Sequence, residues 1–318
     1  MLPNLQEIEE AAAEIYKVIA PTAQISWPLL NNRCGCEVWV KHENHNPTGA
    51  FKVRGGLIYL GNLRKKEPGL EGVCAATRGN HGQSVAFAAA RNGLNAVIVV
   101  PEGNNPDKNA AMKALGAELI IYGRDFDEAV EHATEIAGQR ALHLLPSFHM
   151  DLVTGVATYA LEFFRGAPSL HRVYVPVGLG SGISGIIAAK KALRLETEII
   201  GVVSENANCY QLSFETGKCI STNSADTMAD GLAVRNPSQL ALDVMMGEVE
   251  RIVDVSDQQV FDAISCYFDD THNVAEGAGA AGLAALLEEK KLNEGQKVGV
   301  ICSGGNISKD LLKQALGG

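Results

Sequence analysis

The stretch Asn46-Pro47-Thr48-Gly49-Ala50-Phe51-Lys52-Val53-Arg54-Gly55-Gly56 sets a single lysine where a turn gives way to an apolar run of helical length. Pro47 and Gly49 break regular structure just before the lysine. A lysine held at a helix N-terminus among apolar groups is disfavoured as an ammonium by the helix dipole and by burial. We therefore expect Lys52 to have a lowered pKa and to be a nucleophilic amine, as a Schiff base with a carbonyl cofactor requires. A lysine with no matching motif elsewhere would be an ordinary surface residue.

Strand-like and helix-like stretches alternate along most of the chain. Short apolar runs predict strands at 37–41, 73–76, 96–100, 118–122, 141–145, 173–177, 199–203, 251–255 and 297–302. Amphipathic runs predict helices at 51–64, 81–91, 106–115, 126–137 and 186–193. This alternation is typical of an α/β fold in which mostly parallel open sheets are covered by helices. The length of 318 residues favours two domains, which we place at 1–69 with 147–318 for the larger and 70–146 for the smaller.

The composition argues against several classes of partner. The formal net charge is −10 and no basic run occurs, so we expect no nucleic acid. No apolar stretch reaches membrane-spanning length and Met1-Leu2-Pro3-Asn4 opens no signal peptide, so we expect a cytoplasmic protein without membrane association. The seven cysteines are odd in number and scattered, which fits reduced thiols. Cys34-Gly35-Cys36 has no second pair to complete a metal site, and we expect no metal.

A second motif, Thr77-Arg78-Gly79-Asn80-His81-Gly82-Gln83-Ser84, directly follows the strand predicted at 73–76. Its glycines allow a tight turn, so that Thr77, Asn80 and backbone amides can direct hydrogen-bond donors at a carboxylate or a ring oxygen. Ligands of open parallel sheets bind beyond the carboxyl ends of the strands, which is where this motif falls. An ordinary capped turn between a strand and a helix is the alternative.

Glycines also gather at Gly178-Leu179-Gly180-Ser181-Gly182, after the strand predicted at 173–177. We call these five residues the glycine cradle, because backbone with few side chains offers several N–H donors to a phosphate. The run 180–185 also fits the pattern G-x-G-x-x-G of dinucleotide-binding enzymes, with Glu205 as the acidic residue after the next strand. A nicotinamide-dependent oxidoreductase is therefore an alternative, as is a helix–strand contact that binds no ligand.

Two further motifs fall nearer the C-terminus. Ser303-Gly304-Gly305-Asn306 follows the strand predicted at 297–302, and the Ser303 hydroxyl can bind a ring nitrogen without adding charge. Ala229-Asp230-Gly231 is a turn of the kind that closes a pocket.

In this order, the motifs around Lys52, Asn80, the glycine cradle, Asp230 and Ser303 resemble those of the fold-type II pyridoxal-phosphate enzymes, which have a fold like that of the tryptophan synthase β subunit. The resemblance covers nearly the whole chain. It is greatest to the threonine dehydratase and serine racemase family, and within it to dehydratases of hydroxy amino acids such as phenylserine dehydratase. It implies pyridoxal 5′-phosphate as the cofactor, a small-molecule β-hydroxy amino acid as the substrate, and a homodimer.

The resemblance also implies roles for individual residues. Lys52 is the catalytic Schiff-base lysine, Asn80 lies beside the ring 3-oxygen, and Ser303 lies at the pyridine nitrogen. The residues implied to bind the cofactor are Phe51, Lys52, Asn80, Gly178, Leu179, Gly180, Ser181, Gly182 and Ser303. The residues implied to bind the substrate are Thr77, Arg78, Gly79, Asn80 and His81.

The expected reaction is β-elimination of water from a β-hydroxy-α-amino acid, which gives a 2-oxo acid and ammonia. The substrate is of the phenylserine, threonine/serine or 3-hydroxyaspartate type, because Arg78 can pair with a second carboxylate or lie over an aromatic ring, with Phe148 adding apolar surface. A broad L-threonine/L-serine dehydratase, a serine racemase and a non-catalytic carrier of pyridoxal phosphate are alternatives. Racemases of the family have a serine where this chain has Arg78, and an arginine is no base near neutral pH.

Overall fold

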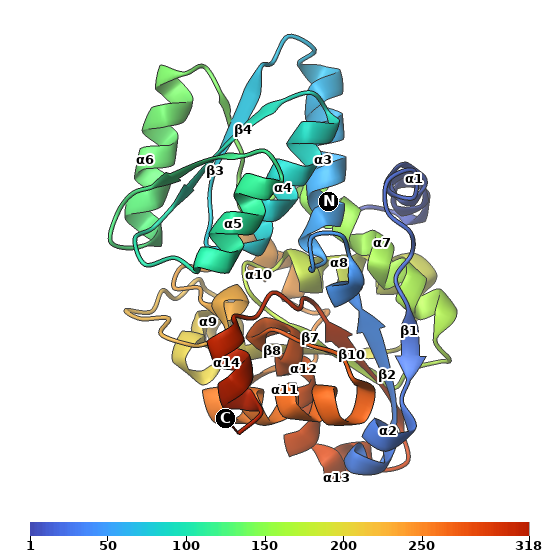
Figure 1. The fold of residues 1–318 in the computed structure, drawn as a ribbon. Helices are drawn as coiled ribbons and strands as arrows, with labels where there is room; N and C mark the ends of the chain where they lie inside the picture. The colour runs from blue at the N-terminus through green and yellow to red at the C-terminus, as the bar shows by residue number, and fades with distance from the viewer. Residues whose placement is uncertain (318) are drawn as a thin grey trace.

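A computed structural model describes residues 1–317 as two sheets with helices packed on them, one sheet above the other in Figure 1. The larger sheet has six strands in the order β1-β2-β10-β7-β8-β9, and the smaller has four in the order β5-β4-β3-β6. All neighbouring strands are parallel except β1 and β2. The strands are β1 (Gln24–Ser26), β2 (Glu37–His42), β3 (Gly72–Ala76), β4 (Asn95–Val100), β5 (Glu118–Ile121), β6 (His143–Leu144), β7 (Arg172–Pro176), β8 (Glu198–Ser204), β9 (Arg251–Val255) and β10 (Lys297–Cys302). The predicted α/β fold with mostly parallel sheets is confirmed.

Helices connect these strands and cover the sheets. The α-helices are α1 (Leu5–Ile15), α2 (Pro28–Cys34), α3 (Lys52–Lys66), α4 (Asn80–Arg91), α5 (Pro106–Ala114), α6 (Phe126–Gln139), α7 (Met150–Gly166), α8 (Ser181–Leu193), α9 (Cys209–Thr216), α10 (Gln239–Met245), α11 (Asp257–Thr271), α12 (Gly277–Glu288), α13 (Lys290–Asn293) and α14 (Lys309–Ala315). Single 3-10 turns are η1 (Glu43–His45), η2 (Glu205–Ala207) and η3 (Asp230–Leu232).

The start of α8 differs from the sequence prediction. We predicted a helix over 186–193, whereas α8 begins at Ser181, inside the glycine cradle. Gly185 lies within this helix, and a Cβ on it would come 2.8 Å from Cγ1 of Val156 on α7. This glycine therefore serves a close contact between two helices.

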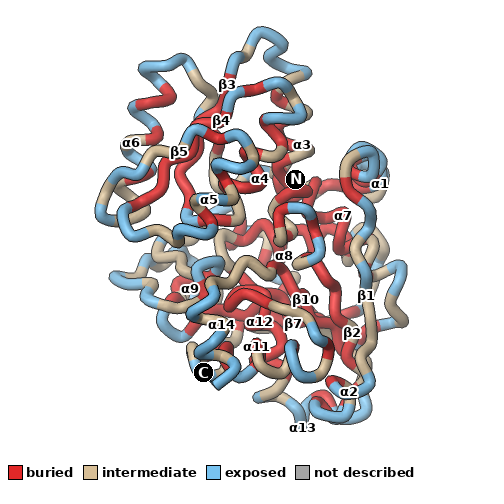
Figure 2. Tube along the Cα trace, viewed as in Figure 1, coloured by how far each residue is buried: buried red, intermediate tan, exposed pale blue. Residues whose placement is uncertain are grey.

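Alternate side chains of the central strands enter separate cores on the two faces of each sheet, as buried parallel strands require. In the large sheet, Val298 and Val300 pack toward α11 and α12, whereas Ile301 packs toward α7 and α8. In the small sheet, Val73 and Ala75 pack toward α3 and α4, whereas Cys74 and Ala76 pack toward α6. Figure 2 shows this buried interior running through both sheets.

Helix α3 packs in both halves of the molecule. It begins at Lys52, and its far half places Tyr59, Leu60 and Leu63 in a core of the small sheet. Fifteen residues of helix span about 22 Å. The strands of the small sheet fall within 72–144, inside the range 70–146 that we predicted for the smaller domain; the domain boundaries themselves stay a prediction.

A buried cluster of charges holds the turn before α3. The Arg54 guanidinium donates to both carboxylate oxygens of Glu43, at 2.8 and 2.9 Å, and to those of Glu162 on α7, at 2.7 and 3.0 Å. Glu43 also accepts a hydrogen bond of 2.7 Å from Nδ2 of Asn46. The side chains of Arg54 and Glu43 are fully buried. Because Glu43 contacts residues on both sides of the turn 47–51, the cluster fixes where Lys52 begins its helix.

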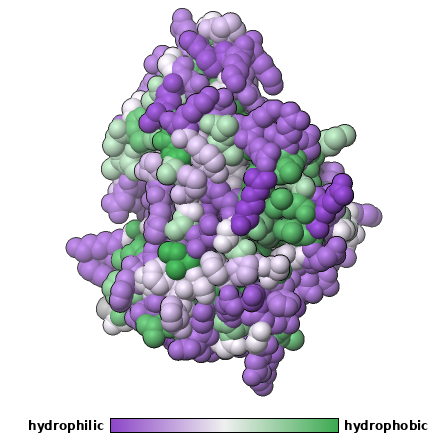
Figure 3. Space-filling model, turned by 90° about the vertical axis from the view of Figure 1, so that its right-hand side faces the viewer, coloured by the Kyte–Doolittle hydropathy of each residue, from purple (hydrophilic) through white to green (hydrophobic). Residues whose placement is uncertain are grey.

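The surface is mostly hydrophilic. Seen from the side that carries α1 and α7, hydrophobic residues gather in one area at the right of the view (Figure 3). All seven cysteines are free of disulfide bonds. No helix within residues 1–317 combines the length and the hydropathy needed to cross a membrane.

Candidate active site

A cavity of about 680 Å³ lies where the carboxyl ends of the strands of both sheets face each other. Every residue that the resemblance implied to bind the cofactor or the substrate lines it: Phe51, Lys52, Thr77, Arg78, Gly79, Asn80, His81, Gly178, Leu179, Gly180, Ser181, Gly182 and Ser303. These residues follow β2, β3, β7 and β10, so the topology gathers segments that lie up to 252 residues apart, from Phe51 to Ser303. Their individual roles stay proposals.

Lys52 is the first residue of α3 and is partly buried. Burial lowers its pKa to about 8, and the charge of Glu276 opposes that effect without cancelling it. The Lys52 Nζ donates a hydrogen bond of 3.1 Å to Oγ of Ser181, and the Lys52 carbonyl accepts one of 2.6 Å from Oγ of Ser84 on α4. The predicted lowering of the pKa therefore has burial as its main cause.

The glycine cradle forms the turn into α8. Gly180 has φ +96°, a left-handed conformation that favours glycine, and it caps the helix that begins at Ser181. A Cβ on Gly178 would come 2.2 Å from the carbonyl oxygen of Gly231, so the two loops pass too closely for a side chain. Tyr210 OH donates to the carbonyl of Leu179 at 3.1 Å. The cradle is thus held rigidly, with the first amides of α8 beside the cavity.

The loop at 77–81 turns into α4 at Asn80. Its conformation is held by a hydrogen bond of 3.1 Å from the Gly79 amide to Oγ1 of Thr77. Arg78 is exposed at the cavity edge. Burial and the nearby Lys52 lower the pKa of His81 to about 3, so its imidazole is neutral near pH 7. Its Nε2 is buried and has no hydrogen-bond partner among the described residues.

Asn80 begins α4 beside the small sheet and Ser303 follows β10 of the large sheet, and both line the same cavity. Asn80 Nδ2 donates to Oε1 of Glu276 at 2.5 Å, and Asn80 Oδ1 accepts from Nδ2 of Asn306 at 2.8 Å. Ser303 is buried, and its carbonyl accepts from the Phe51 amide at 3.0 Å. A hydrogen bond between backbone groups therefore links Phe51, the residue before the lysine, to Ser303.

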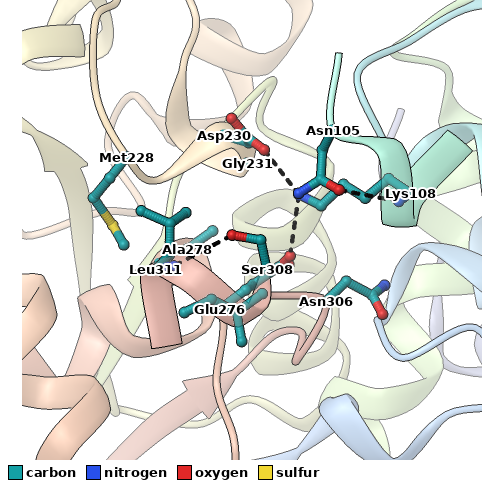
Figure 4. A pocket seen from close by; sticks show the side chains of 12 residues that line it. Asn105, Lys108, Met228, Asp230, Gly231, Glu276, Ala278, Asn306, Ser308 and Leu311 are labelled. Atoms are coloured by element: carbon teal, nitrogen blue, oxygen red, sulfur yellow. Dashed lines mark hydrogen bonds and ion pairs between the residues drawn. The ribbon is translucent and has the colours of Figure 1, made fainter. Parts of the chain in front are cut away.

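Two residues that the sequence did not indicate, Lys108 and Glu276, also line this cavity. Figure 4 shows a smaller adjoining pocket in which the Lys108 ammonium points toward Asp230, at 2.9 Å, and Glu276, at 3.6 Å. Lys108 comes from α5 of the small sheet, and Glu276 immediately precedes α12. Glu276 precedes a run of glycines and alanines at 277–282, and this run could have indicated a site residue from the sequence. The sequence around Lys108 contains no comparable pattern.

Two residues considered for the site lie outside it. Phe148 is not among the residues that line the cavity; it packs against the core on the α7 and α8 side of the large sheet, so its expected contribution to the substrate pocket is wrong. Glu205 lies in η2 and also does not line the cavity. The loop 145–148 contributes Ser147 to the lining, whereas Leu145 is buried in the core of the small sheet.

The residues present fit a phosphate-bearing carbonyl cofactor. A partly neutral lysine amine stands beside the first amides of a helix, which are natural donors to a phosphate. The unpartnered Nε2 of His81 and the buried Ser303 hydroxyl offer further polar contacts in the same cavity. Such a donor set fits the aldehyde and the phosphate of pyridoxal phosphate.

The family model described as pyridoxal-phosphate dependent enzyme matches residues 15–304, and the chain belongs to this family. The L-threonine ammonia-lyase of Thermotoga maritima is 35% identical over 314 residues, which cover 98% of this chain and 78% of that protein. The L-threo-3-hydroxyaspartate ammonia-lyase of Saccharomyces cerevisiae is 30% identical over 308 residues, which cover 96% of this chain and 94% of that protein.

Solved structures agree with this assignment. The structure of maize serine racemase superposes with a TM-score of 0.92 at 28% identity and covers 99% of this chain and 97% of its own. The structure of threonine deaminase isoform 2 from Solanum lycopersicum superposes with a TM-score of 0.89 at 29% identity and covers 99% of this chain and 94% of its own. Family membership confirms pyridoxal phosphate as the cofactor class and decides against the nicotinamide alternative, for which Glu205 would have had to face the cavity.

Proposed function

We propose that this chain is a pyridoxal-phosphate dependent ammonia-lyase that removes water from a β-hydroxy-α-amino acid and yields a 2-oxo acid and ammonia. The place of the Lys52 amine carries the proposal: it faces the cavity between the starts of α4 and α8 and has a pKa of about 8. An amine with this pKa is partly neutral at physiological pH, as a group that takes a proton from carbon must be. The names of the relatives support the same reaction class.

Each part of the site has an assigned partner in this proposal. When bound, pyridoxal phosphate supplies an electron-withdrawing ring that stabilises negative charge at Cα. We assign the amides of the glycine cradle to its phosphate, Ser303 to its ring nitrogen and Asn80 to its ring oxygen. A neutral serine leaves that nitrogen without a carboxylate partner. The loop 77–81 receives the substrate carboxylate through Thr77, the loop amides and neutral His81.

The protons and bonds balance through Lys52. Its neutral Nζ takes the proton from Cα, the Cβ–O bond breaks, and the hydroxyl leaves as water after receiving a proton. The unsaturated amine that is released tautomerises and is hydrolysed by water to the 2-oxo acid and ammonia. No other side chain that lines the cavity is needed to carry a proton from carbon.

The visible absorption spectrum of the purified protein with pyridoxal phosphate tests the proposal. We expect a lysine-bound cofactor band that is missing in Lys52→Ala, and 2-oxo acid formation from at least one member of a panel of L-threonine, L-serine, L-threo-phenylserine and L-threo-3-hydroxyaspartate. A cofactor band without turnover of any of them would identify a non-catalytic carrier. Chiral analysis of the recovered serine separates racemisation from elimination.

For the side chain of the substrate, we propose an aromatic group. The cavity extends from Lys52 to Phe126 and Val130 on α6, which add apolar surface to a far wall that Asp125 and Asp127 also line. Arg78 at the edge can lie over an aromatic ring. We expect Phe126→Ala to lower kcat/KM for phenylserine about tenfold, because one aromatic contact is lost. For threonine, which has no ring, we expect kcat/KM to fall less than threefold. A 3-hydroxyaspartate-specific loss in Arg78→Ala would instead favour a dicarboxylic substrate.

We further propose that the protein is a homodimer, as the resemblance to the racemase and dehydratase family implies. Light scattering of the holoenzyme across a range of concentrations measures its mass directly. A monomer at all concentrations would contradict this.

A further inference from the structure

We propose that Ser181 is a positioning residue for Lys52: its hydroxyl holds the lysine Nζ on the cavity wall after the Cα proton has been taken, so that the same proton goes to the departing β-hydroxyl. This inference rests on the proposed function. It concerns a side chain in the glycine cradle, where the phosphate assignment needs only backbone amides.

The contact between the two residues is direct. Ser181 Oγ lies 3.1 Å from Nζ of Lys52, and Ser181 is 2% exposed. Within residues 1–317, Ser181 is the hydrogen-bond partner found for this amine. As the first residue of α8, Ser181 has its own position fixed by the helix that it begins.

The other charged or titratable groups near Lys52 are engaged elsewhere or neutral. Glu276 raises the pKa of Lys52 by its charge, but its oxygens face Asn80 and Lys108. His81 has a pKa of about 3 and carries no charge near neutral pH. An ammonium formed in this cavity therefore depends on Ser181 as its acceptor, and an ammonium without a partner is costly in a partly buried site.

The step is balanced in protons and electrons. The Cα–H bond breaks and its proton becomes one of three on the Lys52 Nζ. A second N–H donates to Ser181 Oγ and fixes the orientation of the ammonium. The electron pair left at Cα forms the Cα=Cβ double bond as the Cβ–O bond breaks and its own electron pair stays on oxygen. The ammonium protonates that oxygen, water leaves, and Lys52 is neutral again. Ser181 itself gains and loses no proton.

The competing role for Ser181 is that of a phosphate ligand, since its hydroxyl also lines the cavity at the start of α8. The two roles differ in what they require of the protein without cofactor. A phosphate ligand has no effect on the lysine amine in the apoprotein, whereas a partner of the ammonium changes how readily that amine loses its proton.

The test compares Ser181→Ala with Ser184→Ala. Ser184 lies three residues further along α8, is fully buried, and its hydroxyl has no hydrogen-bond partner among the described residues, so it controls for loss of a buried hydroxyl. Acetic anhydride labelling of the apoproteins across a pH series, read as modification of the Lys52 peptide by mass spectrometry, reports the neutral amine. We expect Ser181→Ala to be labelled about threefold faster near pH 7, because loss of a hydrogen bond to the ammonium favours the neutral form. Ser184→Ala should match the wild type.

The holoenzyme gives a second readout. The reaction is run in D2O, and the amount of recovered substrate with deuterium at Cα is divided by the amount of 2-oxo acid formed. We expect this ratio to be at least about threefold higher in Ser181→Ala than in the wild type, with a lower kcat and an unchanged KM. Unchanged Lys52 labelling, or a loss confined to cofactor affinity in a titration with pyridoxal phosphate, overturns the role of Ser181. If the wild type turns over none of the substrates, the proposed function is contradicted. The labelling result is independent of that outcome, because it is measured on the apoproteins.

Discussion

Lys108 on α5, beside the small sheet, and Asp230 in η3, on the side of the large sheet, form an ion pair of 2.9 Å across the active-site cavity. The Lys108 side chain is 7% exposed, and Glu276 lies 3.6 Å from the same nitrogen. Burial disfavours this ammonium, but the carboxylates of Glu276 and Asp230 outweigh burial and raise the pKa of Lys108. A second ion pair, between Arg235 and Asp127, joins the same loop region to the start of α6. Both pairs link the two halves of the molecule across the cavity.

Replacing Lys108 should weaken this link between the two halves of the molecule. We expect Lys108→Met to raise KM for the amino acid about tenfold, with kcat changed less, because two carboxylates lose their partner at the cavity. Steady-state kinetics measure this. Lys113→Met is the control, since Lys113 is on the same helix, is exposed and is expected to leave both constants unchanged. Equal effects of the two variants would show that the contact does not serve closure.

Cofactor capture should depend on pH through Lys52. The neutral amine is the nucleophile, and the pKa of Lys52 is about 8, so the fraction of neutral amine rises with pH until that value and then levels off. The rate at which the apoprotein gains the bound-cofactor band should rise about tenfold per pH unit below pH 7 and become constant above about pH 9. Stopped-flow absorbance follows it. A rate that keeps rising through pH 10 would mean that burial does not lower the pKa of this amine.

Breaking the buried charge cluster around Arg54 should lower the free energy of unfolding more than breaking an ion pair at the surface. Arg54→Met leaves the carboxylates of Glu43 and Glu162 buried without their shared partner, and we expect a loss of about 3–5 kcal/mol in the free energy of unfolding. Urea denaturation of both variants measures the difference. Arg165→Met removes an exposed pair with Glu9, where both side chains are about half exposed, and should cost about 1 kcal/mol or less. Similar losses would contradict the importance given to the cluster.

Two glycines on helices should respond in opposite directions to alanine. A Cβ on Gly155 of α7 would come 2.3 Å from the Arg54 carbonyl, so Gly155→Ala should destabilise the fold by about 1–3 kcal/mol. Gly138 near the end of α6 has no atom within 4 Å of its added Cβ, and Gly138→Ala should stabilise by about 0.5–1 kcal/mol through the backbone. Thermal unfolding separates the two. A neutral Gly155→Ala would show that α7 can shift away from α3.

The sequence predicted the fold and the lining of the site because both depend on local patterns. Apolar runs set the strands, and each site motif directly follows a strand or begins a helix, so parallel topology alone brings Lys52, Asn80 and Ser303 to one place. The antiparallel strand β1 was missed, because three partly buried residues carry no clear alternation.

Long-range partners could not be predicted in the same way. Lys108 and Glu276 are 168 positions apart, and their contact depends on how the two sheets meet, which no local pattern encodes. Phe148 was misplaced for the related reason that a loop residue next to a site motif can turn its ring into the core.

The backbones of α3 and α7 meet almost without side chains between them, since added Cβ atoms on Gly55 and Gly155 would strike the facing backbone at 2.9 and 2.3 Å. The reacting end of α3 is therefore anchored to the large sheet within one turn of Lys52. Arg78, Phe126 and Val130, which border the far part of the cavity, belong to the other sheet. Under the roles proposed above, the side-chain selectivity at Phe126 and Val130 lies apart from Lys52, so we expect substitutions at these two positions to change which amino acid is accepted while the anchoring of Lys52 stays as it is.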